Sequence, residues 1–200
     1  VVFQRYLHQL VRDGFPIEFF IEGGRSRTGK LLPPRLGVLK MIMDSAQNLR
    51  EGWDVNLVPI GISYEEVAEE GAYRRELQGE DKVTENMGQV VKASSIFGRR
   101  LGRVYLRIGE PIRLSETFAQ LEAPFPDLDA PTREEVVQRT GEQIMHRIGQ
   151  NMLVMPTGLT SLALLAQSKA GIKMDVLKER VQRLLAALKR VHTPAAHSLT

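Results

Sequence analysis

Two short apolar segments on either side of an amphipathic one constrain the fold of this 200-residue chain most strongly. Residues 17–21 and 55–63 are nearly continuous apolar runs rich in β-formers, a composition typical of strands. Residues 37–49, between them, carry apolar side chains at helical spacing, and residues 104–108 alternate as a third strand. Strand, helix and strand in this order predict an α/β fold with a mixed, largely parallel sheet flanked by helices.

The distribution of prolines divides the chain into three parts. Residues 1–122 hold the strands and begin with a helix over residues 2–13. Residues 123–131 contain three prolines and are typical of a linker. Residues 132–200 show apolar spacing typical of helices only, at 133–149, 158–169 and 173–191. We therefore expect an α/β region, a Pro-rich linker and a helical tail.

Composition excludes several classes of function. The chain has no cysteine, which excludes disulfides, thiol catalysis and iron–sulfur clusters. No apolar run approaches the roughly 20 residues that a membrane-spanning helix needs. The net charge is +3, but acids predominate over residues 65–85 and bases over residues 92–113, and only 6% of residues are aromatic. A nucleic-acid footprint would be a one-sided basic stripe with stacking aromatics, so we expect no nucleic-acid partner.

The most informative segment is the loop that follows the first expected strand, residues 22–30 (EGGRSRTGK). It contains three cations, two hydroxyls and three glycines. In open α/β sheets ligands bind beyond the carboxyl ends of strands. Glycines let backbone N–H groups approach an anion, and arginine grips phosphate oxygens with a planar fork. The loop therefore predicts phosphate recognition.

Two other interpretations compete for this loop. Residues 24–30 match the nucleotide-binding pattern G-x-x-x-x-G-K, but Leu31 stands where that motif needs Ser or Thr for magnesium. Pro33 and Pro34 also block the helix whose N-terminus would receive the phosphates, which argues against a nucleotide site. A solvated basic turn is the alternative that assigns the loop no ligand.

At this point the sequence resembles a known family. FIEGGRSRTGK (20–30) and VPIGISYE (58–65) resemble the third and fourth signature blocks of glycerol-3-phosphate acyltransferases, in order and at the expected distance. The similarity continues through residues 73–79, 108–112 and 159–166, so it covers essentially the whole chain. The resemblance is to the bacterial membrane-associated type in the lysophospholipid acyltransferase-like superfamily. Dihydroxyacetone-phosphate acyltransferases are near relatives. The resemblance makes residues 1–122 the C-terminal portion of an acyltransferase domain.

The resemblance implies a reaction and a set of site residues. A fatty acyl group would pass from acyl-CoA or acyl carrier protein to the sn-1 hydroxyl of glycerol-3-phosphate in phospholipid biosynthesis, without a cofactor or metal. The third block implies that glycerol-3-phosphate is bound by Glu22, Gly23, Arg25, Ser26 and Arg27. The fourth block implies substrate-binding roles for Pro59 and Tyr64 and a catalytic role for Glu65. The alternative for Glu65 is one more acid in an acidic stretch. The resemblance also implies a peripheral location on a membrane lipid surface, at the cytoplasmic face of the bacterial inner membrane.

The family's general base is the histidine of an H-x-x-x-x-D block. His8 and Asp13 have this spacing, but only 13 residues separate His8 from Glu22, too few for the arginine-bearing block that comes between. Residues five apart on a helix also face different directions. We expect the histidine block upstream of residue 1 and predict that this chain alone has no acyltransferase activity. The alternative is a non-catalytic module that binds phosphate or anionic lipid and lacks the histidine.

The last expected helix, residues 173–191, is amphipathic and basic. Its apolar stripe consists of Leu177, Val181, Leu184, Leu185 and Leu188, and it carries six bases against two acids. This pattern fits a helix lying on a membrane surface. A helix that packs its stripe on the protein core fits equally well.

Overall fold

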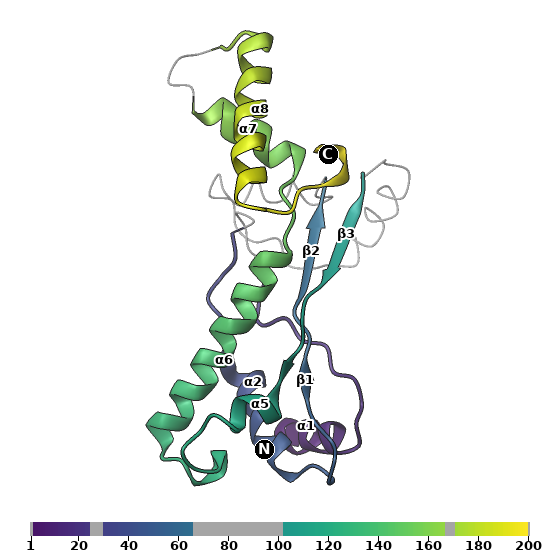
Figure 1. Cartoon of the computed structure of the whole chain (residues 1–200). Helices are drawn as coiled ribbons and strands as arrows, with labels where there is room; N and C mark the ends of the chain where they lie inside the picture. The colour runs from purple at the N-terminus through teal and green to yellow at the C-terminus, as the bar shows by residue number, and fades with distance from the viewer. Residues whose placement is uncertain (1, 25–29, 66–101, 167–170, 200) are drawn as a thin grey trace, which may run out of the picture. The chain divides into compact units, whose positions relative to one another are not determined.

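The structure, a computed structural model, describes residues 2–24, 30–65, 102–166 and 171–199 (Figure 1). It mixes helices with small sheets and divides into two compact units, each assembled from two stretches of chain. Unit 1 consists of Val1–Gly61 and Ile108–Asn151. Unit 2 consists of Ile62–Arg107 and Met152–Thr200. The domain boundaries expected at residues 122 and 132 stay a prediction.

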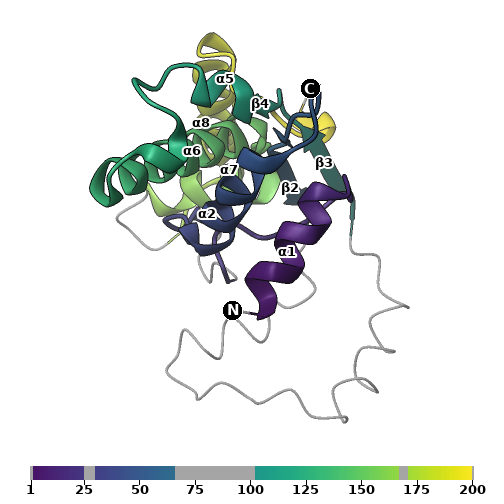
Figure 2. The ribbon, with the colours of Figure 1, turned by 90° about the horizontal axis from the view of Figure 1, so that it is seen from below.

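Three helices build the core of unit 1. They are α1 (Val2–Arg12), α2 (Leu36–Ser45) and α6 (Ala130–Asn151), and the short 3-10 helix η1 (Ala46–Asn48) continues α2. Helix α2 packs against both α1 and α6, as Figure 2 shows from below. The apolar faces expected from helical spacing therefore meet in one cluster, where Leu39 and Met43 of α2 are fully buried.

A short antiparallel ribbon completes unit 1. Strand β1 (Asn56–Leu57) pairs with β4 (Ile112–Arg113), with Leu57 opposite Ile112. The chain turns from β4 directly into α5 (Leu114–Phe118). Asp54 holds this corner, because its carboxylate accepts hydrogen bonds from the Ser115 hydroxyl at 2.6 Å and the Ser115 N–H at 3.1 Å.

The expected Pro-rich linker contains structure. Within it lies the 3-10 helix η2 (Phe125–Asp127), whose Phe125 is 1% exposed and contacts the ring of Phe118. Helix α6 begins directly after Asp129, whose carboxylate accepts the Thr132 N–H at 2.8 Å. Hydrogen bonds from the Thr132 side chain and backbone lower the pKa of Asp129. The Asp129 carboxylate thus caps α6, because it accepts one of the backbone N–H groups that have no partner at the start of a helix.

Strands β2 (Ile60–Tyr64) and β3 (Val104–Ile108) pair with each other. The Gly109 N–H donates to the Pro59 carbonyl beyond one end, and the Glu65 N–H donates to the Arg103 carbonyl beyond the other. This pairing runs antiparallel, because the earlier residue of one strand faces the later residue of the other.

Unit 2 contains two further helices. Helix α7 (Pro156–Leu165) packs against α8 (Met174–Arg190), and the chain ends in the 3-10 helix η3 (His197–Leu199) (Figure 1). The apolar stripe of α8 is half-buried, and no residue of α8 is fully buried. The half-burial favours the packing interpretation of this stripe.

Two expectations about the sheet need correction. Residues 17–21 form no strand, although their burial alternates from half-buried Ile17 to buried Ile21. The expected strand over residues 55–63 is split into β1 and β2, with Pro59 between them. The pairs among the described strands are antiparallel, and residues 17–21 do not lie in a ladder beside 55–63. An apolar run predicts extended backbone and burial, but the strand with which it pairs depends on distant residues.

Candidate functional site

The loop of the third block is closed at its base by two hydrogen bonds. The Glu22 carboxylate accepts the Leu32 N–H at 2.7 Å, across ten residues of chain. The Arg35 N–H donates to the Ile21 carbonyl, also at 2.7 Å. Glu22 is half-buried, and its carboxylate is used to hold the two arms of the loop together. The structure thus gives Glu22 a role in the shape of the loop.

Gly23 occupies a position that favours glycine for two reasons. Its φ is +64°, a conformation that side chains with a Cβ rarely adopt. A Cβ added there would lie 2.7 Å from Cγ of Arg35, whereas a Cβ on the adjacent Gly24 would meet nothing within 4 Å. Only the first of the two glycines is therefore required by the backbone.

The remaining third-block residues, Arg25, Ser26 and Arg27, lie outside the described residues, so their contact with a phosphate stays a prediction. After the loop, the chain takes up no helix until α2 begins at Leu36. The prolines at 33 and 34 therefore do delay the helix, as expected. A helix N-terminus does not follow Lys30 directly, and the nucleotide-binding arrangement is absent from this part of the described chain.

The fourth block spans both units. Pro59, in unit 1, is fully buried, and its carbonyl accepts the Gly109 N–H at 2.8 Å. A Cβ on Gly61 would lie 2.9 Å from the backbone carbon of Asn151. A Cβ on Gly109 would collide with the Asn151 side-chain amide. The glycines at 61 and 109 thus let the last residue of α6 approach the backbone on either side of Pro59.

The other end of the fourth block lies in unit 2. Tyr64 closes β2 and is 48% exposed. The Glu65 carboxylate accepts three hydrogen bonds: from the Arg103 N–H and the Tyr105 hydroxyl, both at 3.0 Å, and from the Ser198 hydroxyl at 3.2 Å. These bonds lower the pKa of Glu65, the bond from Arg103 having the largest effect, while desolvation acts in the opposite direction.

A carboxylate with a lowered pKa is a weaker base, so the geometry gives Glu65 a positioning role. The catalytic role implied by the resemblance stays a prediction. The expectation that Arg25 and Glu65 face one cleft also stays a prediction, because Arg25 lies outside the described residues.

In the described part of the chain, His8 of α1 and Asp13, which follows that helix, make no hydrogen bond or ion pair with each other. The Asp13 carboxylate accepts a hydrogen bond from the Gln9 side chain at 2.8 Å. Among the described residues, no group of three or more His, Asp or Glu side chains lies close enough to hold a metal ion.

Sequence reasoning missed several residues that shape the site. Arg35 packs its stem over Gly23, and the side chains of Tyr105 and Ser198 hold Glu65. The Arg147 guanidinium donates to the carbonyls of Glu110 and Pro111, at 2.7 and 2.9 Å. No local pattern marks these residues, because each acts on a distant segment.

Comparison with known protein families gives two matches. The glycerol-3-phosphate acyltransferase C-terminal region matches residues 73–200, and the acyltransferase family matches residues 2–63. Together they cover most of the chain, and both predicted signature blocks fall within or beside them.

Individual proteins are similar over nearly the same length. Glycerol-3-phosphate acyltransferase of Pseudomonas fluorescens (strain SBW25) is 35% identical over 198 residues, which are 95% of this chain and 23% of that protein. The enzyme of the same name from Pseudomonas putida (strain W619) is 35% identical over 197 residues, 95% of this chain and 24% of that protein. The chain thus spans about a quarter of the length of the curated relatives it matches. No solved structure matches.

Proposed function

Because this chain belongs to the glycerol-3-phosphate acyltransferase family, we propose that it supplies the acceptor-binding loop of an acyltransferase. That enzyme transfers a fatty acyl group from acyl-CoA or acyl carrier protein to the sn-1 hydroxyl of glycerol-3-phosphate. The acceptor follows from the names of the relatives, and the donor from the chemistry that the family resemblance implies.

The closed base of the third-block loop is the observation that carries this proposal. Glu22 and Arg35 fix both arms of a segment whose sequence contains Arg25 and Arg27. Fixed arms reduce the conformational freedom that binding would otherwise remove, so a charged segment on them can hold a dianion at lower entropic cost. Arginine forks suit the three free oxygens of a phosphate monoester.

In the proposed reaction the acceptor hydroxyl attacks the thioester carbonyl and gives up its proton to a general base. Glu65 is poorly suited to take that proton, because three hydrogen bonds stabilise its charged form. We assign to this chain the holding of the acceptor phosphate. We assign to Pro59 the shaping of the start of β2, and to Tyr64 and Glu65 the shaping of its end. Proton transfer belongs to the histidine block that the resemblance implies.

The proposal also includes the largely parallel sheet of the family fold. Residues 17–21 are extended and alternate in burial, as a strand does. One side of the β2–β3 ribbon in unit 2 exposes Ile62, Tyr64, Val104 and Leu106, with 37 to 61% of each side chain accessible. An apolar strand face of this kind is typical of a sheet that further elements cover. We propose that the whole enzyme supplies them.

The acceptor site is tested by Arg25→Lys in an acyltransferase that contains this chain. Lysine keeps the charge but loses the planar fork. We expect the KM for glycerol-3-phosphate to rise about ten- to hundredfold while the KM for the acyl donor stays nearly unchanged. Arg139→Lys on the exposed side of α6 is the matched control. The phosphate assignment fails if Arg25→Ala raises the KM for the acceptor less than about threefold.

The same assay separates the rival functions. A non-catalytic module would lack the H-x-x-x-x-D block in the upstream coding sequence and would bind phosphate or anionic lipid without turnover. A dihydroxyacetone-phosphate acyltransferase would show the higher kcat/KM with that ketone as acceptor.

We also propose that unit 2 contacts a lipid surface, at the cytoplasmic face of the membrane. No helix in the described parts of the chain has the length and apolar content to cross a bilayer. Leu162 and Leu165 near the end of α7 are 53% and 82% exposed, and Met174 at the start of α8 is 62% exposed. The exposed base Lys173 precedes α8. Apolar side chains beside bases suit an anionic lipid surface.

Vesicle sedimentation tests this contact. Leu165→Asn should weaken binding to phosphatidylglycerol vesicles by about tenfold, while Phe3→Asn, which changes an exposed apolar residue of unit 1, should not. Equal binding by Leu165→Asn and the unmodified chain would exclude this surface.

A further inference from the structure

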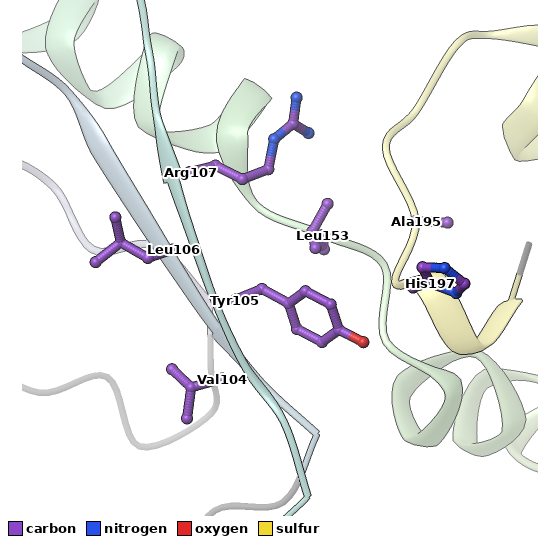
Figure 3. Close-up of a pocket in the computed structure, with 7 residues that line it drawn as sticks. All are labelled: Val104, Tyr105, Leu106, Arg107, Leu153, Ala195 and His197. Carbon is purple, nitrogen blue, oxygen red and sulfur yellow. The ribbon is translucent and has the colours of Figure 1, made fainter.

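Unit 2 contains a cavity of about 550 Å³ between β3 and the C-terminal segment. Its lining side chains are Tyr105 and Arg107 of β3, together with Leu153, Ala195 and His197 (Figure 3). The side chains of Val104 and Leu106 point to the other side of the strand, so only their backbone borders the cavity. None of the residues so far assigned to acceptor binding lines it.

The walls of the cavity are fixed by hydrogen bonds. The Val154 N–H donates to the Pro194 carbonyl and the Ala196 N–H donates to the Val154 carbonyl, both at 2.9 Å. Ala196 is fully buried. The Leu153 N–H donates to the Ser63 hydroxyl at 3.0 Å, which ties the remaining wall to β2. The cavity is therefore formed before any ligand arrives.

The cavity combines a cation with an apolar floor. Among the described residues, the Arg107 guanidinium has no hydrogen-bond or ion-pair partner, so its N–H donors are available. The Leu153 side chain and the Tyr105 ring provide apolar surface beside it. The Glu65 carboxylate, which contacts the lining residue Tyr105, already accepts the Tyr105 hydroxyl at 3.0 Å and two further donors. A guanidinium beside apolar groups suits an anion that carries a hydrocarbon chain.

We propose that this cavity is a second phosphate site, which binds an amphiphilic phosphate ester. Arg107 binds the phosphate of this ester, and the apolar chain of the ester packs against Leu153. Two ligands of the proposed reaction share this chemistry: the acyl-CoA donor and the acylated glycerol phosphate product. The choice of these two ligands rests on the proposed function, whereas the site itself lies wholly in unit 2 and involves no residue of the loop at 22–32.

Calorimetric titration of the 200-residue chain tests the site with four probes: octanoyl-CoA, 1-octanoylglycerol-3-phosphate, inorganic phosphate and 1-octanoylglycerol. We expect one or both acylated phosphates to bind and 1-octanoylglycerol not to bind. Inorganic phosphate should bind more weakly than the acylated esters. Arg107→Gln should weaken the binding of the acylated phosphate at least about tenfold. Arg113→Gln, an exposed arginine of β4, is the matched control and should change it less than about twofold.

Two further measurements keep the test decisive. Arg25→Gln should leave the ligand-induced amide shifts of Tyr105, Leu153 and Ala195 unchanged, which separates the site from the acceptor loop and from the fate of the proposed function. Amide chemical shifts of Tyr105, Leu153 and Ala195 in the unmodified chain should move on titration, a readout that needs no variant. Equal binding of 1-octanoylglycerol, unmoved amides at these three residues, or full affinity in Arg107→Gln would each overturn the proposal.

Discussion

Replacing Glu22 tests whether the third-block carboxylate shapes the loop or touches the substrate. A carboxylate oxygen of Glu22 lies 2.7 Å from the Leu32 nitrogen. This hydrogen bond and the one from the Arg35 N–H to the Ile21 carbonyl join the two arms of the loop. Glu22→Ala removes that acceptor and leaves the partly buried Leu32 N–H without it. A hydrogen bond to a charged group contributes about 1.5–3 kcal/mol, and a neutral one about 1 kcal/mol. Glu22→Gln should therefore lose only part of the effect.

Hydrogen exchange at the Leu32 amide measures this effect without any ligand. We expect Glu22→Ala to accelerate exchange by about ten- to hundredfold and Glu22→Gln by less, because the energies above correspond to these ratios. Glu18→Ala is the matched control, since Glu18 is an exposed acid four residues earlier on the same extended segment. In the whole enzyme, Glu22→Ala should raise the KM for glycerol-3-phosphate more than Glu22→Gln does.

One combination of results would refute this reasoning. If Glu22→Ala leaves exchange of the Leu32 amide unchanged but still raises the KM for the acceptor, Glu22 contacts the substrate and does not act through the loop.

Two other predictions follow from backbone geometry and charge. Gly23→Ala should lower the midpoint of thermal unfolding, because a positive φ and the stem of Arg35 both oppose a Cβ, while Gly24→Ala should not; equal midpoints would contradict this. Glu65 has a pKa below its ordinary value near 4.5, so its contribution to stability is present above that pH and is lost as pH falls through the lowered pKa. Denaturant titrations should show Glu65→Gln less stable than the unmodified chain at pH 7, and this difference should shrink as the pH falls below 4.5 and through the lowered pKa; a difference constant with pH would refute the assignment.

The helices and one strand could be predicted because their signals are local. Apolar spacing over residues 2–13 and 104–108 matches α1 and β3 within a residue or two. Asp13 and Gly14 mark the end of α1, and the φ of Gly14 is +75°. Such signals need no knowledge of the rest of the chain.

Strand pairing could not be predicted in the same way. The break between β1 and β2 was visible in the sequence, because Pro59 lacks the N–H that a central ladder uses. The pairing partner of β1 was not visible in the sequence, because β4 follows more than fifty residues later in the chain. The order of strand, helix and strand favours a parallel crossover, yet the described pairs are antiparallel ribbons.

The two acids of the candidate site show why residue type alone misassigns chemistry. Glu22 and Glu65 stand in signature blocks, where a carboxylate suggests a substrate contact or a proton acceptor. In the structure each accepts a backbone N–H, from Leu32 and Arg103. A carboxylate used in this way cannot take a proton without weakening the bond that holds the backbone. The proposed function therefore assigns acceptor recognition to the loop cations Arg25 and Arg27. We expect the loss of one of them to affect binding of the acceptor more than the rate of the chemical step.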